Sequence, residues 1–453
     1  MKTTLQVLMI FLLFTAAGRA QTGAGPRPSV VLISVDGLRP DYVLQAGQYA
    51  LKIPNLKRFL SEGAYATGVR GVVPTVTYPS HTTILTGVSP ARHGIFANTT
   101  FDPLNKNAGG WYWYAADIQA PTLWDAAAAA GYSTGNVHWP VSAGAKVTFN
   151  LPQYWRTGTP DDRKLQRLLS TPGLLEEMEN QLGPYADGID ETIEGDENRG
   201  RFTVWMLNKK KPQFMTAYFT ALDHVQHATG PFSKESLATL ERIDAIVGEV
   251  VKAANAATHG NVVICVVSDH GFVQTDFEVN LLPAFRSSGL VRYNEGDNEH
   301  PASWDATLWL AGGSAAVVLR EANDAIRDRV QKLLADLQAD PANGIDRIIP
   351  AGELQEHGGF PGASFLVSLK PGYRFGSRST GAIVRPVAKS GMHGYWPGLP
   401  EMRAAFFIVG QGIRPGSLGE IDMRDIAPTL AGIMRVKLPK AETKSLDLST
   451  TKP

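Results

Sequence analysis

The chain has 453 residues, with 43 Lys and Arg against 43 Asp and Glu, 43% hydrophobic residues and a single cysteine. This composition is typical of a large globular protein, and the zero net charge argues against a broad positive surface for nucleic acid or an anionic membrane. One cysteine excludes an internal disulfide and a thiolate-rich metal site. A bound metal would therefore need His, Asp, Glu or hydroxyl ligands.

The N-terminus has the pattern of a secretory signal peptide. Lys2 precedes an apolar run over residues 5–14, and small residues follow at the spacing that a signal peptidase reads. The apolar run is too short to span a membrane, although a buried N-terminal helix is an alternative. We expect cleavage after Ala20, removal of residues 1–20 as signal peptide, and export of residues 21–453 to a periplasm or the cell exterior.

Along the mature chain, short apolar runs alternate with longer amphipathic stretches. The runs typical of strands buried on both faces lie at residues 29–35, 214–222, 262–267, 314–319, 364–369 and 404–409. The helical patterns lie at residues 53–60, 122–130, 234–256 and 322–337. This alternation predicts an α/β fold with a mostly parallel central sheet and helices on both faces. The sequence has no internal repeat and no apolar stretch that predicts a membrane span.

Two inserted segments interrupt this alternation, at about residues 141–212 and 274–389. The first is polar and contains an acidic patch, made of Asp187, Asp190, Glu191, Glu194, Asp196 and Glu197. The second is rich in Gly, Asn and Pro. Insertions above the C-terminal edge of a sheet often carry function, but they also occur as solvated decoration, and the sequence favours neither. We expect one catalytic domain that includes both.

Polar residues collect where the predicted strands end. Asp36 follows the first strand, Asp223 and His227 follow the strand that begins at residue 214, and Asp269 and His270 follow the strand at residues 262–267. A single Asp or His at such a place is more often a cap or a turn former. Because parallel strands bring their C-terminal ends to one crevice, three such clusters predict a metal site of Asp and His ligands.

A fourth element is His393, which lies between two glycines whose small size allows close approach of a backbone. With it there are six candidate ligands, enough for two metal ions. Paired metals suit displacement at phosphorus. Residues 74–87 supply hydroxyls just before a short helical pattern, and Thr77 or Ser80 there is either an activated nucleophile or a plain helix N-cap.

Together these residues resemble the nucleotide pyrophosphatase/phosphodiesterase family of the alkaline phosphatase superfamily. The resemblance rests on five elements in order, Asp36-Gly37, residues 77–81, Asp223 with His227, residues 268–271 and residues 391–395, and it extends over residues 28–439. It implies an alkaline phosphatase-like catalytic domain with two Zn²⁺, or another divalent metal such as Mn²⁺. It also implies hydrolysis of phosphodiester or pyrophosphate bonds in small, nucleotide-type substrates.

The resemblance also implies roles for individual residues. One zinc would be held by Asp223, His227 and His393, and the other by Asp36, Asp269, His270 and Thr77. Thr77 would be the nucleophile that becomes phosphorylated. Asn98 would bind a non-bridging phosphoryl oxygen together with the Thr77 backbone N–H, and Tyr78 and Tyr218 would sandwich a nucleobase.

The sequence departs from the family pattern around the pocket for the leaving group. The family usually has Asn where Ser80 stands and Asp-Asn where Trp396-Pro397 follow the last motif. A phosphomonoesterase or a phosphonoacetate hydrolase on the same metal pair therefore remains an alternative, and a non-catalytic binding protein is a further one. The oligomeric state is left open.

Overall fold

The computed structural model describes residues 27–107, 110–154, 159–186, 188 and 190–449. The expected signal peptide at residues 1–20 lies outside the described residues. Within them, no helix combines the length and the apolar character that crossing a bilayer requires.

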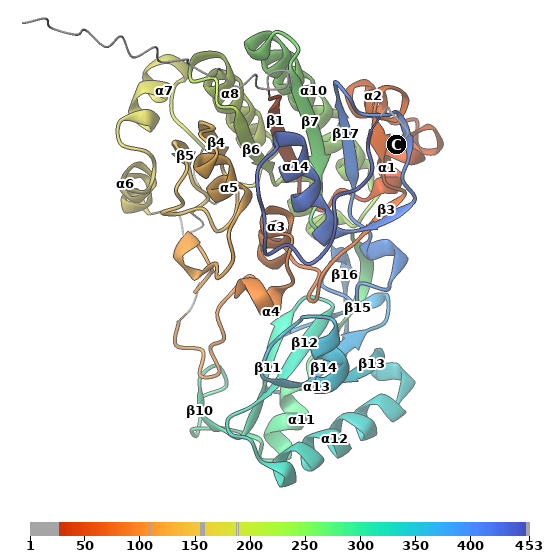
Figure 1. The fold of residues 1–453 in the computed structure, drawn as a ribbon. Coiled ribbons are helices and arrows are strands. Elements are labelled where there is room, and N and C mark those ends of the chain that lie inside the picture. The colour runs from red at the N-terminus through yellow and green to blue at the C-terminus, as the bar shows by residue number, and fades with distance from the viewer. Residues whose placement is uncertain (1–26, 108–109, 155–158, 187, 189, 450–453) are drawn as a thin grey trace, which may run out of the picture.

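The core of the fold is an eight-stranded sheet in the order β18-β2-β17-β7-β1-β6-β4-β5 (Figure 1). Only β17 runs antiparallel to its neighbours, so the prediction of a mostly parallel sheet is confirmed. The strands are β1 (Ser29–Val35), β2 (Ala64–Tyr65), β4 (Thr134–Val137), β5 (Phe149–Leu151), β6 (Phe214–Phe219), β7 (Val262–Val267), β17 (Phe406–Gly410) and β18 (Gly416–Ser417). The central strands are continuous β-branched and aromatic runs because both of their faces are covered.

Helices cover both faces of this sheet, as the alternating pattern predicts. Val31 and Ile33 of β1 face one hydrophobic core, whose helices include α2 (Pro54–Glu62), α8 (Ile193–Lys209) and α10 (Lys234–Thr258). Val30 and Leu32 face the opposite core, whose helices include α3 (Thr77–Thr86), α5 (Leu123–Ala129) and α14 (Ile426–Met434). Successive side chains of β1 point to opposite faces of the sheet, so the hydrophobic interior has two layers.

A smaller antiparallel sheet lies beyond one end of the central sheet, in the lower part of Figure 1. Its strands are β11 (Ala306–Ala311), β12 (Ser314–Leu319), β14 (Ala363–Leu369) and β13 (Ile345–Pro350), and its helices are α11 (Leu282–Ser287), α12 (Asp324–Ala339) and α13 (Ala351–Glu356). A three-stranded sheet of β15 (Gly372–Phe375), β8 (Val273–Val279) and β16 (Val384–Met392) connects it to the main body. The apolar runs at 314–319 and 364–369 are therefore strands, but of this second sheet.

The segment at about 141–212, which the sequence predicts to be an insertion, contributes to both the central sheet and the helical layer. It contains the edge strand β5, then α6 (Pro160–Leu169), α7 (Leu174–Leu182) and α8, and Phe202 and Met206 of α8 are buried in the first core. The remaining elements are α1 (Pro40–Leu44), α4 (Pro90–His93), α9 (Ala221–Thr229), β3 (Gly68–Arg70), β9 (Val291–Tyr293), β10 (Pro301–Trp304) and β19 (Glu420–Asp422).

One boundary differs from its prediction in a way that matters for the site. The apolar run at 214–222 leaves the sheet after Phe219, and α9 begins at Ala221. Asp223 and His227 are therefore four residues apart on one helix, which places them on the same face one turn from each other.

Candidate metal centre

Three neighbouring strands bring the predicted Asp and His residues together. β7, β1 and β6 are adjacent and parallel, and they are followed by Asp269 with His270, by Asp36, and by α9. Their C-terminal ends meet at one edge of the sheet, which is where open α/β sheets bind ligands. The fold therefore explains why residues more than 200 positions apart share one site.

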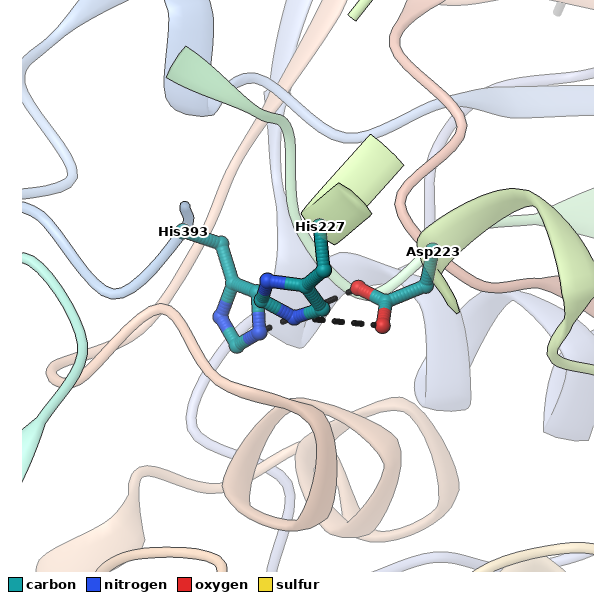
Figure 2. Close-up of side chains that lie close together, drawn as sticks. All are labelled: Asp223, His227 and His393. Atoms are coloured by element: carbon teal, nitrogen blue, oxygen red, sulfur yellow. Dashed lines mark ion pairs between the residues drawn. The ribbon is translucent and has the colours of Figure 1, made fainter. Parts of the chain in front are cut away.

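The first group consists of Asp223 and His227 from α9 and His393 from the end of β16 (Figure 2). The Asp223 carboxylate lies 3.3 Å from His227 Nε2 and 3.8 Å from His393 Nε2. Figure 2 shows both imidazole rings turned toward this one carboxylate. The arrangement presents two nitrogens and an oxygen to a common point, as a metal site of three protein ligands requires.

Glycines allow the His393 segment to approach the first group. A Cβ at Gly391 would lie 2.4 Å from the Gln226 carbonyl of α9, and a Cβ at Gly394 would lie 1.8 Å from the Ala311 carbonyl. Gly394 also has a φ of +86°, which L side chains rarely adopt. The expected close approach of backbone beside His393 is confirmed.

The second group, Asp36, Asp269 and His270, is buried. His270 Nε2 lies 3.1 Å from Asp269 Oδ2 and 3.4 Å from Asp36 Oδ1. The rings of His270 and His393 stack with their centroids 3.7 Å apart, so the two groups are direct neighbours.

The three histidines of the two groups all turn the same ring nitrogen, Nδ1, toward the protein backbone. Their Nδ1 atoms lie 3.1–3.3 Å from backbone carbonyls, those of Gly391 for His227, Gly271 for His270 and Thr75 for His393. A carbonyl only accepts, so each Nδ1 carries the proton and donates it. Each Nε2 lone pair is left to face the site, which is the usual arrangement of a histidine that binds metal.

Each of the three carboxylates keeps one buried oxygen without a hydrogen-bond partner, namely Asp36 Oδ1, Asp223 Oδ1 and Asp269 Oδ2. The second oxygen of Asp269 accepts from the backbone N–H groups of Gly37 (3.1 Å) and His270 (3.0 Å). Buried unpaired oxygens are costly, and a cation removes that cost. The residues present therefore fit a pair of divalent cations.

The electrostatics of the site also favour a bound cation. Burial raises the pKa of Asp36 well above its ordinary value, and the charges of Asp223 and Asp269 raise it further. Burial acts in the same direction on Asp223, but His227, His393 and His270 together outweigh burial and leave the pKa of Asp223 lowered. Among the described residues, no Lys or Arg pairs with these three carboxylates.

Thr77 is the first residue of α3, and its hydroxyl points into the second group. Thr77 Oγ1 lies 3.4 Å from His270 Nε2, whereas the N-cap of α3 is Val76. Neither Thr77 nor Ser80 acts as the N-cap, so the capping alternative is wrong. The N-terminus of α3 adds a partial positive charge beside this hydroxyl.

Asn98 lies beside the start of α3. Its Oδ1 accepts a hydrogen bond of 2.9 Å from the backbone N–H of Tyr78. With Oδ1 used as an acceptor, Nδ2 is the group of this side chain that would donate to a ligand. A role for Asn98 on a phosphoryl oxygen stays a prediction.

Tyr218, expected to stack on a base, is enclosed by protein in the structure. Its side chain is 1% exposed, its hydroxyl donates to Asp36 Oδ2, and His138 stacks on its ring (centroids 5.8 Å apart, planes at 16°). These contacts favour a role of Tyr218 in supporting Asp36, and its stacking on a base stays a prediction. Tyr78 is also buried and packs edge-on against Trp111, and its contact with substrate stays a prediction.

Sequence reasoning missed His81, which connects the second group to its surroundings. Its Nδ1 lies 2.8 Å from the Thr77 carbonyl and its Nε2 lies 2.8 Å from Ser34 Oγ. Asp269 Oδ2 is 3.6 Å from the same Nδ1. His81 stands in the hydroxyl-rich segment, but nothing local distinguishes it from a core residue.

Two neighbouring Asp/His groups at the C-terminal edge of a parallel sheet, with a hydroxyl beside one of them, are the arrangement of proteins with paired-metal sites suited to phosphoryl chemistry. The family described as type I phosphodiesterase/nucleotide pyrophosphatase matches residues 30–396. The chain belongs to this family.

Curated proteins of similar sequence have names of the same kind. The bis(5'-adenosyl)-triphosphatase ENPP4 of Pongo abelii is 26% identical over 273 residues, covering 59% of this chain and 53% of the relative. Ectonucleotide pyrophosphatase/phosphodiesterase family member 1 of Homo sapiens is 28% identical over 260 residues, covering 54% and 24%. The matched part spans about half the length of the ENPP4 relatives.

The fold is that of murine ectonucleotide pyrophosphatase/phosphodiesterase 5, whose inactive variant was solved in complex with AMP. The TM-score is 0.64 at 21% identity, with 91% of this chain and 96% of that chain covered. This likeness confirms the α/β fold and its mostly parallel sheet.

Proposed function

We propose that this protein hydrolyses phosphodiester or pyrophosphate bonds at a pair of divalent cations, with Zn²⁺ as the preferred metal. The observation that carries the proposal is the position of the Thr77 hydroxyl beside His270 of the second of two neighbouring Asp/His groups, in which each Asp carboxylate has one unpaired oxygen. One cation would bind Asp223, His227 and His393, and the other Asp36, Asp269, His270 and Thr77. Nitrogen and oxygen donors without thiolates suit zinc or manganese.

The residues have separate roles in the proposed reaction. The Thr77 hydroxyl attacks phosphorus and the leaving group departs on the opposite side, which gives a phosphothreonine that water then hydrolyses. A bound cation pair supplies Lewis acidity for the attacking, leaving and non-bridging oxygens. Asn98 Nδ2 and the Thr77 backbone N–H donate to a non-bridging oxygen and hold phosphorus in line with Thr77.

Nucleotide-type small molecules are the substrates that we propose. One relative is named a bis(5'-adenosyl)-triphosphatase, and the murine structure of similar fold was solved with AMP. The sequence motifs assign no Lys or Arg to the phosphoryl group of a substrate. A phosphomonoester carries two charges and would gain from such cations, so we favour diesters.

The experiment compares a bis-aryl phosphodiester, a dinucleotide and an aryl phosphomonoester, each with and without a chelator. We expect the two diesters to be cleaved at least about tenfold faster in kcat/KM than the monoester, a difference of about 1.4 kcal/mol. The chelator should abolish both reactions. A monoester preference would favour the phosphomonoesterase alternative, and cleavage of none of the three would favour a binding protein or a phosphonoacetate hydrolase, which phosphonoacetate itself would reveal.

We also propose that residues 1–20 are an export signal and that residues 21–453 form one catalytic domain with inserted segments at about 141–212 and 274–389. The apolar run after Lys2 supports export, and the central position of α8 supports a single domain. N-terminal sequencing of the exported protein tests the signal. Sequence that begins after Ala20 is the expected result.

A further inference from the structure

The acidic patch of the first inserted segment divides into two sets with different surroundings. Glu194 of α8 is exposed, Glu197 is half-buried, and both pair with Arg242 of α10 at 2.8 Å. Asp196, on the same helix, is fully buried. Asp187 lies outside the described residues. The patch is therefore more than a solvated face, and its buried member needs a separate explanation.

Asp196 provides the N-terminal cap of another helix, α9. Its carboxylate accepts from the backbone N–H of Thr220 at 3.1 Å and from that of Ala221 at 2.8 Å. The residue at the N-cap of α9, Thr220, makes no capping bond with its own side chain. A carboxylate there satisfies otherwise unpaired amides and matches the positive end of the helix dipole.

Arg199 completes this connection between α8 and α9. Its guanidinium lies 2.9 Å from Asp196 Oδ1 and 3.3 Å from Thr220 Oγ1, and it also donates to the Asp190 carbonyl. Both charged side chains are fully buried. The next residue, Glu191, reaches His224 of α9 at 3.2 Å. The start of α8 thus holds the start of α9 through several polar contacts.

The opposite side of α9 is fixed to the central sheet. Gln226 Nε2 donates to the Gly37 carbonyl at 3.0 Å, directly after Asp36, and Gln226 Oε1 accepts from Tyr42 at 2.9 Å. α9 is therefore held at its N-terminus by Asp196 and along its length by Gln226. Asp223 and His227 belong to the same nine-residue helix, so its placement sets the positions of both side chains.

We propose that Asp196 and Arg199 are positioning residues for the metal group Asp223, His227 and His393, acting through the N-terminus of α9. The inference rests on the proposed function, because it assumes that this group binds a metal ion. It gives the inserted segment a role in aiming two ligands at a common point. Partners that orient ligands typically change metal affinity by about 10–100-fold when they are replaced.

The test measures binding of Zn²⁺ and Co²⁺ to the full chain by competition with a chromophoric chelator, together with the visible spectrum of the Co²⁺ form. Asp196→Asn removes the charge and one acceptor of the cap. We expect the affinity of one of the two metal sites to fall about 10–100-fold and the Co²⁺ spectrum to change. The matched controls, Glu194→Gln and Glu197→Gln on the same helix, should leave both unchanged.

Folding of the variants is checked by thermal unfolding of the metal-free proteins. Asp196→Asn removes the carboxylate beside the buried Arg199 charge, so the double variant Asp196→Asn/Arg199→Gln removes both charges and is the second test. A cooperatively folded variant of either kind that keeps wild-type affinity and the wild-type Co²⁺ spectrum would overturn the inference. A wild-type protein that binds no metal would instead overturn the proposed function.

Discussion

At the scale of residues, Asp36 and Asp269 each direct one carboxylate oxygen to protein donors and leave the other without a hydrogen-bond partner. Asp269 shows this division: Oδ1 accepts two backbone N–H groups, and Oδ2 has no hydrogen-bond partner and lies 3.1 Å from His270 Nε2. Each of the three histidines likewise uses Nδ1 to donate to a backbone carbonyl and leaves Nε2 facing the site. Such division fixes the direction of each donor atom before a cation binds, which reduces the cost of binding.

Replacement of Thr77 tests the nucleophile. Thr77→Ala removes the hydroxyl and leaves Asp36, Asp269 and His270 in place, so we expect metal content near wild type and diesterase activity at least about 10³-fold lower. Thr77→Ser keeps a hydroxyl and should keep part of the activity. Steady-state kinetics and elemental analysis of the purified proteins measure both quantities. Full activity of Thr77→Ala would refute the role of this hydroxyl.

Replacement of Tyr218 distinguishes support of a ligand from stacking on a base. Tyr218→Phe keeps the ring but removes the hydrogen bond to Asp36, which leaves a buried carboxylate oxygen unpaired. We expect a loss of stability of about 1–3 kcal/mol in the metal-free protein and weaker metal binding, with KM for a dinucleotide unchanged once metal is saturating. If Tyr218 stacked on the base, Tyr218→Phe would behave as wild type, and Tyr218→Leu would raise KM.

At the scale of elements, the sequence predicts the strands well and the start of α9 poorly. β1 and β7 are continuous β-branched runs buried on both faces, and their predicted and observed bounds agree. The apolar pattern continues to Leu222, but the chain turns into a helix at Ala221, where Asp196 caps it. A cap supplied from another helix leaves no local pattern.

Contacts between residues that are distant in sequence leave no local pattern, and this limits which site residues could be predicted. Asp36, Asp223, His227, Asp269 and His270 could be predicted as one cluster because they follow strands of one sheet, whereas His393 was singled out by its flanking glycines. His81, Asp196 and the hydroxyl contact of Tyr218 could not be found, because their partners are distant in sequence and their residue types are ordinary in a core. The hydroxyl of Tyr218 and Asp36, for example, are 182 positions apart.

The contact between the start of α8 and α9 predicts a pH dependence of stability. Burial raises the pKa of Glu191 from 4.5 to about 8, and the charge of Asp223 raises it further. A carboxyl with a raised pKa in the folded state stabilises the fold while it is protonated. The contribution of Glu191 to the free energy of unfolding is complete below about pH 4.5 and is lost as the pH rises toward 8. Each tenfold difference in proton affinity between the folded and unfolded states corresponds to about 1.4 kcal/mol.

The measurement is denaturant unfolding of the metal-free protein between pH 5 and 8. We expect the free energy of unfolding of wild type, relative to Glu191→Gln, to fall across this range, because glutamine has no charge to bury. Glu194→Gln, at an exposed position, is the control and should run parallel to wild type. Parallel curves for Glu191→Gln and wild type would contradict the assigned environment of this carboxyl.

At the scale of the whole molecule, the metal centre joins two parts of the fold. The central sheet supplies five of the six Asp and His residues, and His393 returns from the segment of smaller sheets at residues 273–392. Close backbone contact at Gly391 and Gly394 holds this return to α9 and β11. The second sheet is therefore tied to the site through one ligand, and the first metal group is incomplete without it.

The most direct test of the proposed centre is a titration of metal-free protein with Zn²⁺ in which bound metal and diesterase activity are measured on the same samples. We expect two ions per chain at saturation, no activity without metal, and activity that appears as the second ion binds. Full diesterase activity in protein that holds no metal would contradict the proposed centre.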